Sequence, residues 1–269
     1  MKVNGKIIAV TGAGSGIGRE LSLLLLAKDA KVAGVDLNTA ALSETARLAG
    51  SHASEFEPIA TNIADRPAVE ALPERICTRF GAVDGLINNA GIIQPFVRVN
   101  DLDYPTIERV LNVNLLGTLY VAKAFLPYLL KRPQAHLVNL SSMGGFVPVP
   151  GQTIYCAAKA GVRLLTEGLA AELIDTNVKV TVVFPGAIAT NITANSGVSS
   201  PPTSQPDQKG SLKPMLARKA AEIIVRAMER DAQHVFVGRD SAVMNILHRL
   251  NPSFAARMIA NKMKSALPS

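Results

Sequence analysis

The chain has 269 residues, 48% of them hydrophobic, with 16 Pro and 20 Gly. This length suits one large α/β domain better than two, and the composition excludes a disordered or repetitive chain. The net charge of +7 comes almost wholly from residues 213–269, where 10 Lys and Arg stand against 4 Asp and Glu, whereas residues 1–212 hold 18 against 17. A basic surface spread over the fold, as nucleic-acid binding requires, is therefore not expected.

Apolar strands alternate with amphipathic helices along the chain, which is typical of a parallel sheet with helices on both faces. Strands are expected at residues 6–11, 31–36, 56–60, 84–88, 135–140, 178–184 and 234–237. Helices are expected from the glycine-rich turn to 28, then at 40–48, 67–80, 104–130, 153–174 and 215–229. This pattern predicts a Rossmann-type, doubly wound α/β fold in a single domain.

Two segments differ in texture from the rest. Residues 191–214 are rich in Ser, Thr, Asn and Pro, and a loop of this length is typically a lid, a binding loop or disordered. We expect the catalytic, dinucleotide-binding part to cover 1–238, with a substrate loop at about 191–214, and a basic amphipathic helical extension of the same domain to cover 239–269.

Pro252 divides the extension into two expected helices, in which apolar residues alternate with Arg239, Arg249, Arg257, Lys262 and Lys264. An apolar face beside a basic one can lie on an anionic membrane surface. Packing over the pocket or over a neighbouring subunit is the favoured interpretation, and peripheral membrane contact is the alternative.

The start of the chain runs directly into a strand, with no secretory signal before it, so we expect a cytoplasmic protein. Residues 21–27 form the longest early apolar run, which is too short to span a bilayer.

Cys77 and Cys156 are far apart and are expected to be reduced thiols. The four histidines lack ligand spacing, so no metal is expected.

A glycine-rich turn with Gly12, Gly16 and Gly18 lies between the first strand and the first helix, where the pyrophosphate of a dinucleotide meets helix N-terminal amides. Asp36 ends the next strand, and its carboxylate can bind the adenosine ribose and repel a 2′-phosphate. Ser15 precedes Gly16 and supplies no cation for a phosphate, so NAD is favoured over NADP. The competing interpretation is that Asp36 only caps the next helical region.

Tyr155 and Lys159 stand one helical turn apart, and Ser142 lies thirteen residues before Tyr155. A phenol has a pKa of about 10, and an ammonium four residues along the same helix face can lower it. Ser142 can hold a substrate oxygen against the phenol. A Tyr/Lys pair by itself is more often a solvated helix face, and Ser141 is the structural rival of Ser142.

In this order and spacing, the motifs resemble those of the short-chain dehydrogenase/reductase family up to about residue 190. The matching residues are Thr11-Gly-x-x-x-Gly16-x-Gly18, Asn88-Asn-Ala-Gly91, Asn114, Ser142, Tyr155, Lys159, Pro185-Gly186 and Thr190. The chain departs from the family at Asn62, where Asp is frequent, which puts adenine binding only mildly in doubt.

The resemblance implies that Tyr155 is the general base in alcohol oxidation and the acid in the reverse reaction. Lys159 and the positive charge of the oxidised nicotinamide would together lower the pKa of Tyr155 against the effect of burial. Lys159 would also bind the nicotinamide ribose, while Ser142 holds the reacting oxygen. Asn114 would interrupt its helix and hold a water on the proton path. The implied cofactor residues are Gly12, Ser15, Gly16, Ile17, Gly18, Asp36, Asn62, Ile63, Asn89, Ala90, Gly91, Tyr155, Lys159, Pro185, Gly186, Ile188 and Thr190.

Substrate contacts are expected from the segment between the catalytic serine and tyrosine. These residues are Ser142, Met143, Phe146, Gln152 and Tyr155, with Val147, Val149 and Ile154 nearby. The segment is mostly apolar and has no Lys or Arg, which favours an uncharged, hydrophobic secondary alcohol or ketone. The alternative is that several of these side chains face the core or a partner subunit.

The leading hypothesis is an NAD-dependent oxidoreductase that acts on CH–OH groups. One alternative is an NAD-using epimerase or dehydratase, and another is a non-catalytic protein that senses the cofactor. The resemblance also implies a homodimer or homotetramer assembled through the helices at 104–130 and 153–175.

Overall fold

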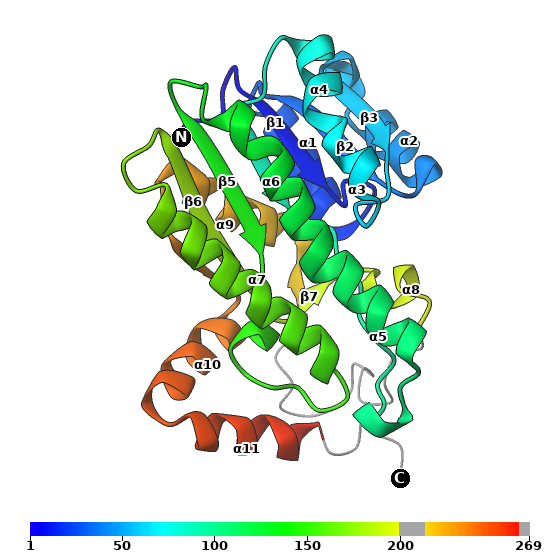
Figure 1. Cartoon of the computed structure of the whole chain (residues 1–269), viewed down its shortest axis with the longest axis vertical. Coiled ribbons are helices and arrows are strands. Elements are labelled where there is room, and N and C mark those ends of the chain that lie inside the picture. The colour runs from blue at the N-terminus through cyan, green and yellow to red at the C-terminus, as the bar shows by residue number, and fades with distance from the viewer. Residues whose placement is uncertain (199–212, 264–269) are drawn as a thin grey trace.

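The computed structural model describes residues 1–198 and 213–263. The predicted substrate loop at about 191–214 therefore lies partly outside the described residues, and Lys264 of the predicted extension lies wholly outside them. Seven parallel strands form one sheet in the order β3-β2-β1-β4-β5-β6-β9, and a two-stranded parallel pair, β7 and β8, lies apart from it (Figure 1). The strands are β1 (Ile7–Thr11), β2 (Lys31–Asp36), β3 (Phe56–Ala60), β4 (Gly85–Asn88), β5 (Ala135–Leu140), β6 (Val178–Pro185), β7 (Ile188–Ala189), β8 (Met215–Leu216) and β9 (His234–Val237). The predicted doubly wound fold is confirmed.

Helices cover both faces of the sheet because successive strand residues point to opposite sides. In β1, Ile8 and Val10 pack against α1, α2 and α9, whereas Ile7 and Ala9 pack against the layer of α3, α4 and α6. The helices are α1 (Gly16–Leu26), α2 (Thr39–Leu48), α3 (Arg66–Glu70), α4 (Leu72–Phe80), α5 (Tyr104–Leu111), α6 (Thr118–Leu129), α7 (Thr153–Glu172), α8 (Ile192–Asn195), α9 (Ala217–Glu229), α10 (Arg239–Leu250) and α11 (Pro252–Lys262). Short 3-10 turns add η1 (Gly50–Glu55), η2 (Val99–Asp101) and η4 (Met143–Gly145).

Two predicted helices are each divided in the structure. The helix expected at 67–80 becomes α3 and α4, because Pro73 has no amide hydrogen to continue the ladder. The helix expected at 104–130 contains a π-helical segment, η3 (Asn112–Gly117), between α5 and α6. The local interruption expected at Asn114 is thereby confirmed, and such π segments are frequent at functional sites.

The span from Tyr104 to Leu129 is long and apolar enough to cross a membrane by length and composition alone. Here it is a layer of the fold, since Val121, Phe125 and Leu129 are buried against the sheet. Length and hydropathy therefore do not distinguish this core helix from a membrane helix.

The predicted division at Pro252 is confirmed, and α10 and α11 form an arm at one end of the molecule (Figure 1). Met244, Ala255 and Ile259 of this arm pack on Phe146 and Phe184 in a third apolar cluster. The arm is thus attached to the body through one apolar face.

Candidate active site

A cavity of about 540 Å³ lies where β1 and β4 adjoin, the point at which the strand order reverses and where ligands bind in open α/β sheets. It extends from Asp36 to Tyr155, and every predicted cofactor residue except Gly18 lines it. Ser142 and its rival Ser141 both line it. The lining residues that were not expected from the sequence are Val35, Leu37, Asn38, Ala41, Thr61, Ile92, Ile93, Val113, Leu140, Ile192 and Asn195. Of the described lining residues, only Asp36, Tyr155 and Lys159 titrate in water.

The glycine-rich turn presents free backbone donors to this cavity. Ser15 precedes α1 without capping it through its side chain, and no acidic residue occupies the first turn of that helix. Gly16 has a φ of 51°, and a Cβ there would lie 3.1 Å from Thr190. Gly18 supports the turn instead of lining the cavity, since a Cβ there would overlap the Gly12 carbonyl. An uncapped helix N-terminus with closely packed glycines fits a pyrophosphate.

Asp36 is held in place by the main chain at the far end of the cavity. Its Oδ2 accepts from the Gly14 amide and its Oδ1 from the Asn38 amide, both at 2.9 Å. Arg19, a cation not expected from the sequence, lies beside the same turn. Its guanidinium donates to the carbonyls of Gly14 and Ala41. The two amide contacts hold the Asp36 carboxylate at the position where an adenosine ribose is expected.

Tyr155 and Lys159 lie on α7 beside Ser142, which follows β5. The Lys159 Nζ is buried and donates to the Leu140 carbonyl at 2.9 Å, while it lies 5.9 Å from the centre of the Tyr155 ring. Burial lowers the pKa of Lys159 to about 8. Burial also raises the pKa of Tyr155 to about 12, although a hydrogen bond from Ser142 works in the opposite direction.

In this structure the pKa of Tyr155 is raised by burial, so the expected joint effect of Lys159 and the oxidised nicotinamide on that pKa stays a prediction. Two physical causes explain the raised pKa. Desolvation of the phenolate outweighs the other effects on Tyr155, and the ammonium is bonded to a carbonyl instead of the phenol.

Asn114 connects the π segment to the chain that follows β4. Its Nδ2 donates to the carbonyls of Ile92 and Val110, and its Oδ1 accepts from the Ile92 amide. A Cβ on Gly91 would lie 2.7 Å from Asn114 Oδ1 and 3.3 Å from Lys159 Nζ, so both side chains flank this glycine. Both amide hydrogens are used by carbonyls, so the side chain fixes the cavity wall, and its expected role in holding a water stays a prediction.

The substrate wall expected between Ser142 and Tyr155 needs correction. Phe146 is buried in an aromatic cluster, with its ring centre 5.5 Å from that of Phe184, so it belongs to the core beneath the arm. Gln152 is buried and donates to the Gln94 carbonyl, and Met143 packs against the same cluster as Phe146. The chain turns inward after η4 because this apolar run is needed to bury the arm, a requirement that the local sequence does not reveal.

Gln94 is a positioning residue that sequence reasoning missed. Its fully buried side chain accepts through Oε1 from the amides of Ile154 and Tyr155, at 2.9 and 3.1 Å. Gln152, the residue before α7, makes no side-chain cap, so Gln94 caps this helix from about 60 residues away. No local pattern in the sequence could have identified this contact.

Replacing Gln94 with Leu is expected to lower kcat by about 10- to 100-fold, since small displacements of a reacting group have effects of this size. The KM for the cofactor should change little. Gln94→Glu keeps an acceptor for both amides at a helix N-terminus and is expected to restore most of kcat. Its negative charge should also shift the pH profile of kcat upward. Equal losses in both variants, explained by matching losses of thermal stability, would contradict this positioning role.

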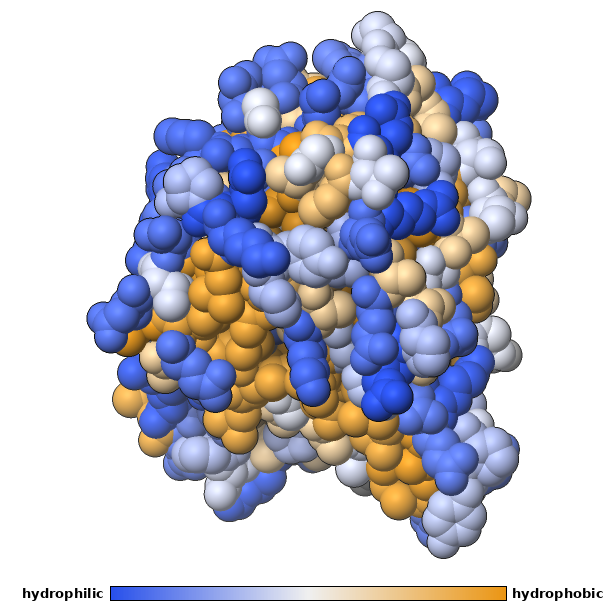
Figure 2. Space-filling view, turned by 45° about the horizontal axis from the view of Figure 1, so that its top comes forward, coloured by the Kyte–Doolittle hydropathy of each residue, from blue (hydrophilic) through white to orange (hydrophobic). Residues whose placement is uncertain are grey.

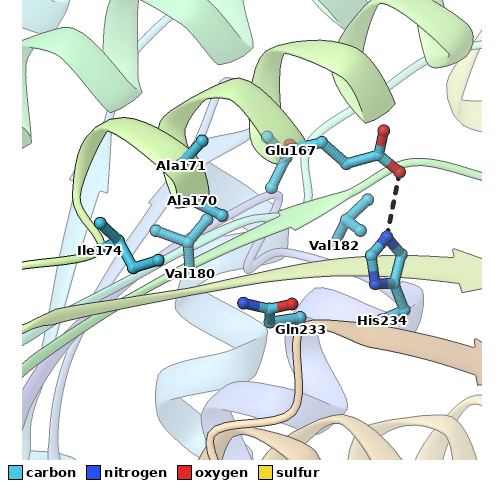
Figure 3. Close-up of a pocket in the computed structure, with 9 residues that line it drawn as sticks. Glu167, Ala170, Ala171, Ile174, Val180, Val182, Gln233 and His234 are labelled. Atoms are coloured by element: carbon cyan, nitrogen blue, oxygen red, sulfur yellow. Dashed lines mark hydrogen bonds and ion pairs between the residues drawn. The ribbon is translucent and has the colours of Figure 1, made fainter.

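A second, smaller hollow of about 250 Å³ lies between α7, β6 and β9, and it contains none of the predicted site residues (Figure 3). Its main polar contact joins His234 to Glu167, at 3.0 Å between Nε2 and Oε1, and Glu167 also pairs with Arg163. The rest of its wall is largely apolar. Its two ionisable groups, His234 and Glu167, are thus paired with each other, and we place the active site at the larger cavity.

Comparisons with known proteins identify the family to which the chain belongs. A family model described as short chain dehydrogenase matches residues 6–199. The "Putative oxidoreductase SadH" of Mycobacterium tuberculosis is 35% identical over 98% of this chain and 97% of its own length. The 3-oxoacyl-[acyl-carrier-protein] reductase FabG of Thermotoga maritima is 36% identical over 72% of this chain and 78% of its own length.

Solved structures share the fold. The crystal structure of a short chain dehydrogenase/reductase from Burkholderia phymatum in complex with NAD superposes with a TM-score of 0.83, at 22% identity, and covers 94% of this chain and 96% of that one. Levodione reductase superposes with a TM-score of 0.78, at 26% identity, and covers 89% of this chain and 98% of that one.

Proposed function

This chain belongs to the short chain dehydrogenase family of oxidoreductases, and from that premise we propose that it transfers hydride between NAD(H) and an uncharged, hydrophobic secondary alcohol or ketone. The observation that carries the proposal is the single cavity that joins Asp36, the glycine-rich turn and Tyr155. Nucleotide-recognition groups and an acid–base group thus line one connected space.

The residues present fit the cofactor. The amides at the start of α1 would hold its pyrophosphate, Asp36 its adenosine ribose, and Lys159 its nicotinamide ribose. When bound, the nicotinamide supplies the hydride acceptor or donor. Its oxidised form also carries the positive charge that the phenol needs.

The residues of this chain perform the proton chemistry. Tyr155 Oη removes the hydroxyl proton as the alcohol is oxidised and returns a proton to the oxygen in the reverse direction. Ser142 donates a hydrogen bond to the same oxygen and stabilises negative charge on it. Lys159 is buried with its ammonium on the Leu140 carbonyl, where it would face the nicotinamide ribose.

An apolar substrate is supported by the cavity wall itself, although several residues first assigned to it lie in the core. Ile92, Ile93, Ile188 and Ile192 line the cavity, and Lys159 is the one Lys or Arg among its described lining residues. No cation other than Lys159 is therefore available in the described wall to bind a carboxylate or phosphate of a substrate.

Oligomer formation is part of the proposal. Tyr104 at the start of α5, Leu164 on α7 and Ile174 after α7 are largely exposed. Figure 2 shows apolar side chains gathered in separate areas of one face, between polar ones. Exposed apolar areas of this kind support a homodimer or homotetramer, which sedimentation velocity would detect.

We also propose a cytoplasmic location.

The activity is tested by mixing purified protein with NAD and a panel of alcohols while NADH absorbance is followed. We expect turnover with apolar secondary alcohols and little with small anionic ones. Turnover with only the anionic alcohols would contradict the substrate class, and an absence of turnover with every alcohol and ketone would contradict the enzymatic role.

Asp36→Asn is expected to lower the ratio of kcat/KM for NAD to that for NADP by about 100-fold. Charge-assisted hydrogen bonds to the ribose, of about 1.5–3 kcal/mol, are lost, and repulsion of a 2′-phosphate is removed. Asn retains an acceptor for the Gly14 or Asn38 amide, so the turn should keep its shape. Asp103→Asn, at the exposed cap of α5, is the control and should leave the ratio unchanged. An unaltered ratio in Asp36→Asn would rule out the assigned ribose contact.

A further inference from the structure

The arm formed by α10 and α11 has two apolar faces, only one of which is buried. Met244, Ala255 and Ile259 cover the aromatic cluster of the body. This inner face accounts for the attachment of the arm to the body. No described residue of the arm lines the cavity, so the expected packing over the pocket is not seen, and packing over a neighbouring subunit stays a prediction. The attachment leaves the opposite face of both helices unexplained.

The outer face of the arm consists of large apolar side chains at helical spacing. Val243, Ile246 and Leu250 follow one another at i, i+3 and i+7 on α10, and Phe254 and Met258 are four residues apart on α11. Leu250 is 78% exposed and Ile246 is 58% exposed. These five large apolar side chains, exposed within sixteen residues, form the outer face of the arm, and exposed apolar patches of this kind mark interaction sites.

Basic side chains accompany this outer face. Arg239, Arg249, Arg257 and Lys262 are all exposed, and none of them forms an ion pair with another described residue. Asp240 is the one acidic residue of the two helices, and its Oδ2 accepts from the Ala187 amide at 2.7 Å. The arm therefore offers unpaired positive charge beside exposed apolar surface.

We propose that the outer face of the arm docks on the surface of a membrane that contains anionic lipids. Apolar side chains would enter the boundary between headgroups and acyl chains, while the four cations contact the headgroups. A second copy of the chain fits this face less well. In a two-fold contact the same patch faces itself, so the four cations of one arm would face those of the other without acidic partners.

The arm is joined to the active site at two points. Asp240 bonds the chain directly after Gly186, and α10 contacts η4, which follows Ser142. A membrane on the outer face would hold the enzyme beside the phase in which apolar alcohols dissolve. This consequence rests on the proposed function, whereas membrane docking itself does not.

The experiment is flotation of the full-length protein with vesicles of phosphatidylcholine alone or with about 30% phosphatidylglycerol. We expect binding to the anionic vesicles only, weakened when NaCl rises from about 0.05 to 0.5 M. Arg249→Gln/Arg257→Gln/Lys262→Gln should reduce the partition coefficient by about a hundred-fold, at about five-fold per cation. Ile246→Gln/Leu250→Gln/Phe254→Gln should abolish flotation.

The matched control is Leu48→Gln/Leu130→Gln, which removes two exposed apolar side chains far from the arm in sequence and should leave flotation unchanged. Melting temperatures identify any variant that fails to fold. Failure of the wild type to float, or flotation of the arm variant at the wild-type level, would overturn the proposal. A second result would also overturn it: the wild type does not float, and the arm variant forms a smaller oligomer than the wild type in sedimentation velocity. A second copy of the chain would then cover this face. Vesicle binding and NADH production are measured separately, so failure of docking is distinguishable from failure of the proposed activity.

Discussion

Tyr155→Phe is expected to lose turnover by about 10²- to 10⁴-fold, the usual contribution of a general acid–base group, while NADH binding is retained. The substitution removes one hydroxyl and keeps the ring that packs beside Lys159. No carboxylate can replace the phenol. Asp36 is the one carboxylate among the described cavity residues, and it is bonded to the glycine-rich turn at the far end of the cavity. Steady-state kinetics and NADH fluorescence titration measure the two effects.

The control for this variant is Tyr104→Phe, which removes a hydroxyl from a largely exposed tyrosine at the start of α5. Its turnover and NADH affinity should match those of the wild type. Near-normal turnover in Tyr155→Phe would exclude the tyrosine as the acid–base group, even if the family assignment stands.

Lys159→Met is expected to lose turnover by about 100-fold or more while the cofactor-free protein unfolds at the same temperature as the wild type or at a higher one. The pKa of Lys159 is lowered from 10.5 to about 8 because the ammonium is buried. At neutral pH this burial destabilises the fold by about 3 kcal/mol, at 1.36 kcal/mol per pKa unit. Loss of the hydrogen bond to the Leu140 carbonyl offsets about half of that gain in the variant.

The pH dependence of this effect has a definite sign. Between about pH 8 and 10.5 the unfolded lysine binds a proton that the folded one has released, so wild-type stability rises with pH in this window. The difference in stability between Lys159→Met and the wild type should therefore become smaller between about pH 8 and 10.5. Lys123→Met, at an exposed position on α6, is the control and should show no such trend. A melting temperature of Lys159→Met well below the wild type at pH 7 would contradict the argument.

Together these two variants test how the catalytic pair functions. Burial raises the pKa of the Tyr155 phenol to about 12 and lowers the pKa of Lys159 to about 8. Both are shifted by burial in the same wall. We infer that binding of the positively charged cofactor, more than Lys159 alone, brings the phenol into its working range.

Much of the fold and the cofactor end of the cavity could be predicted from the sequence, because their signals are local. Strands such as 31–36 and 135–140 are short apolar runs whose parallel pairing follows from the helices between them. The glycine turn and Asp36 lie at the ends of adjacent strands, so the topology alone brings them to one edge. The interruption at Asn114 was likewise expected from its motif and is present.

The sequence by itself thus determined the alternation of strands and helices, the glycine-rich turn and the set of side chains at the carboxyl edge, because hydrophobic period and motif spacing act over short distances. Only the tertiary structure decided that Phe146 faces the core, that Gln94 caps α7, and that burial dominates the pKa of Tyr155. Each of these depends on which distant segment covers a side chain. Desolvation and long-range hydrogen bonds come from that packing, and a single stretch of sequence does not encode it.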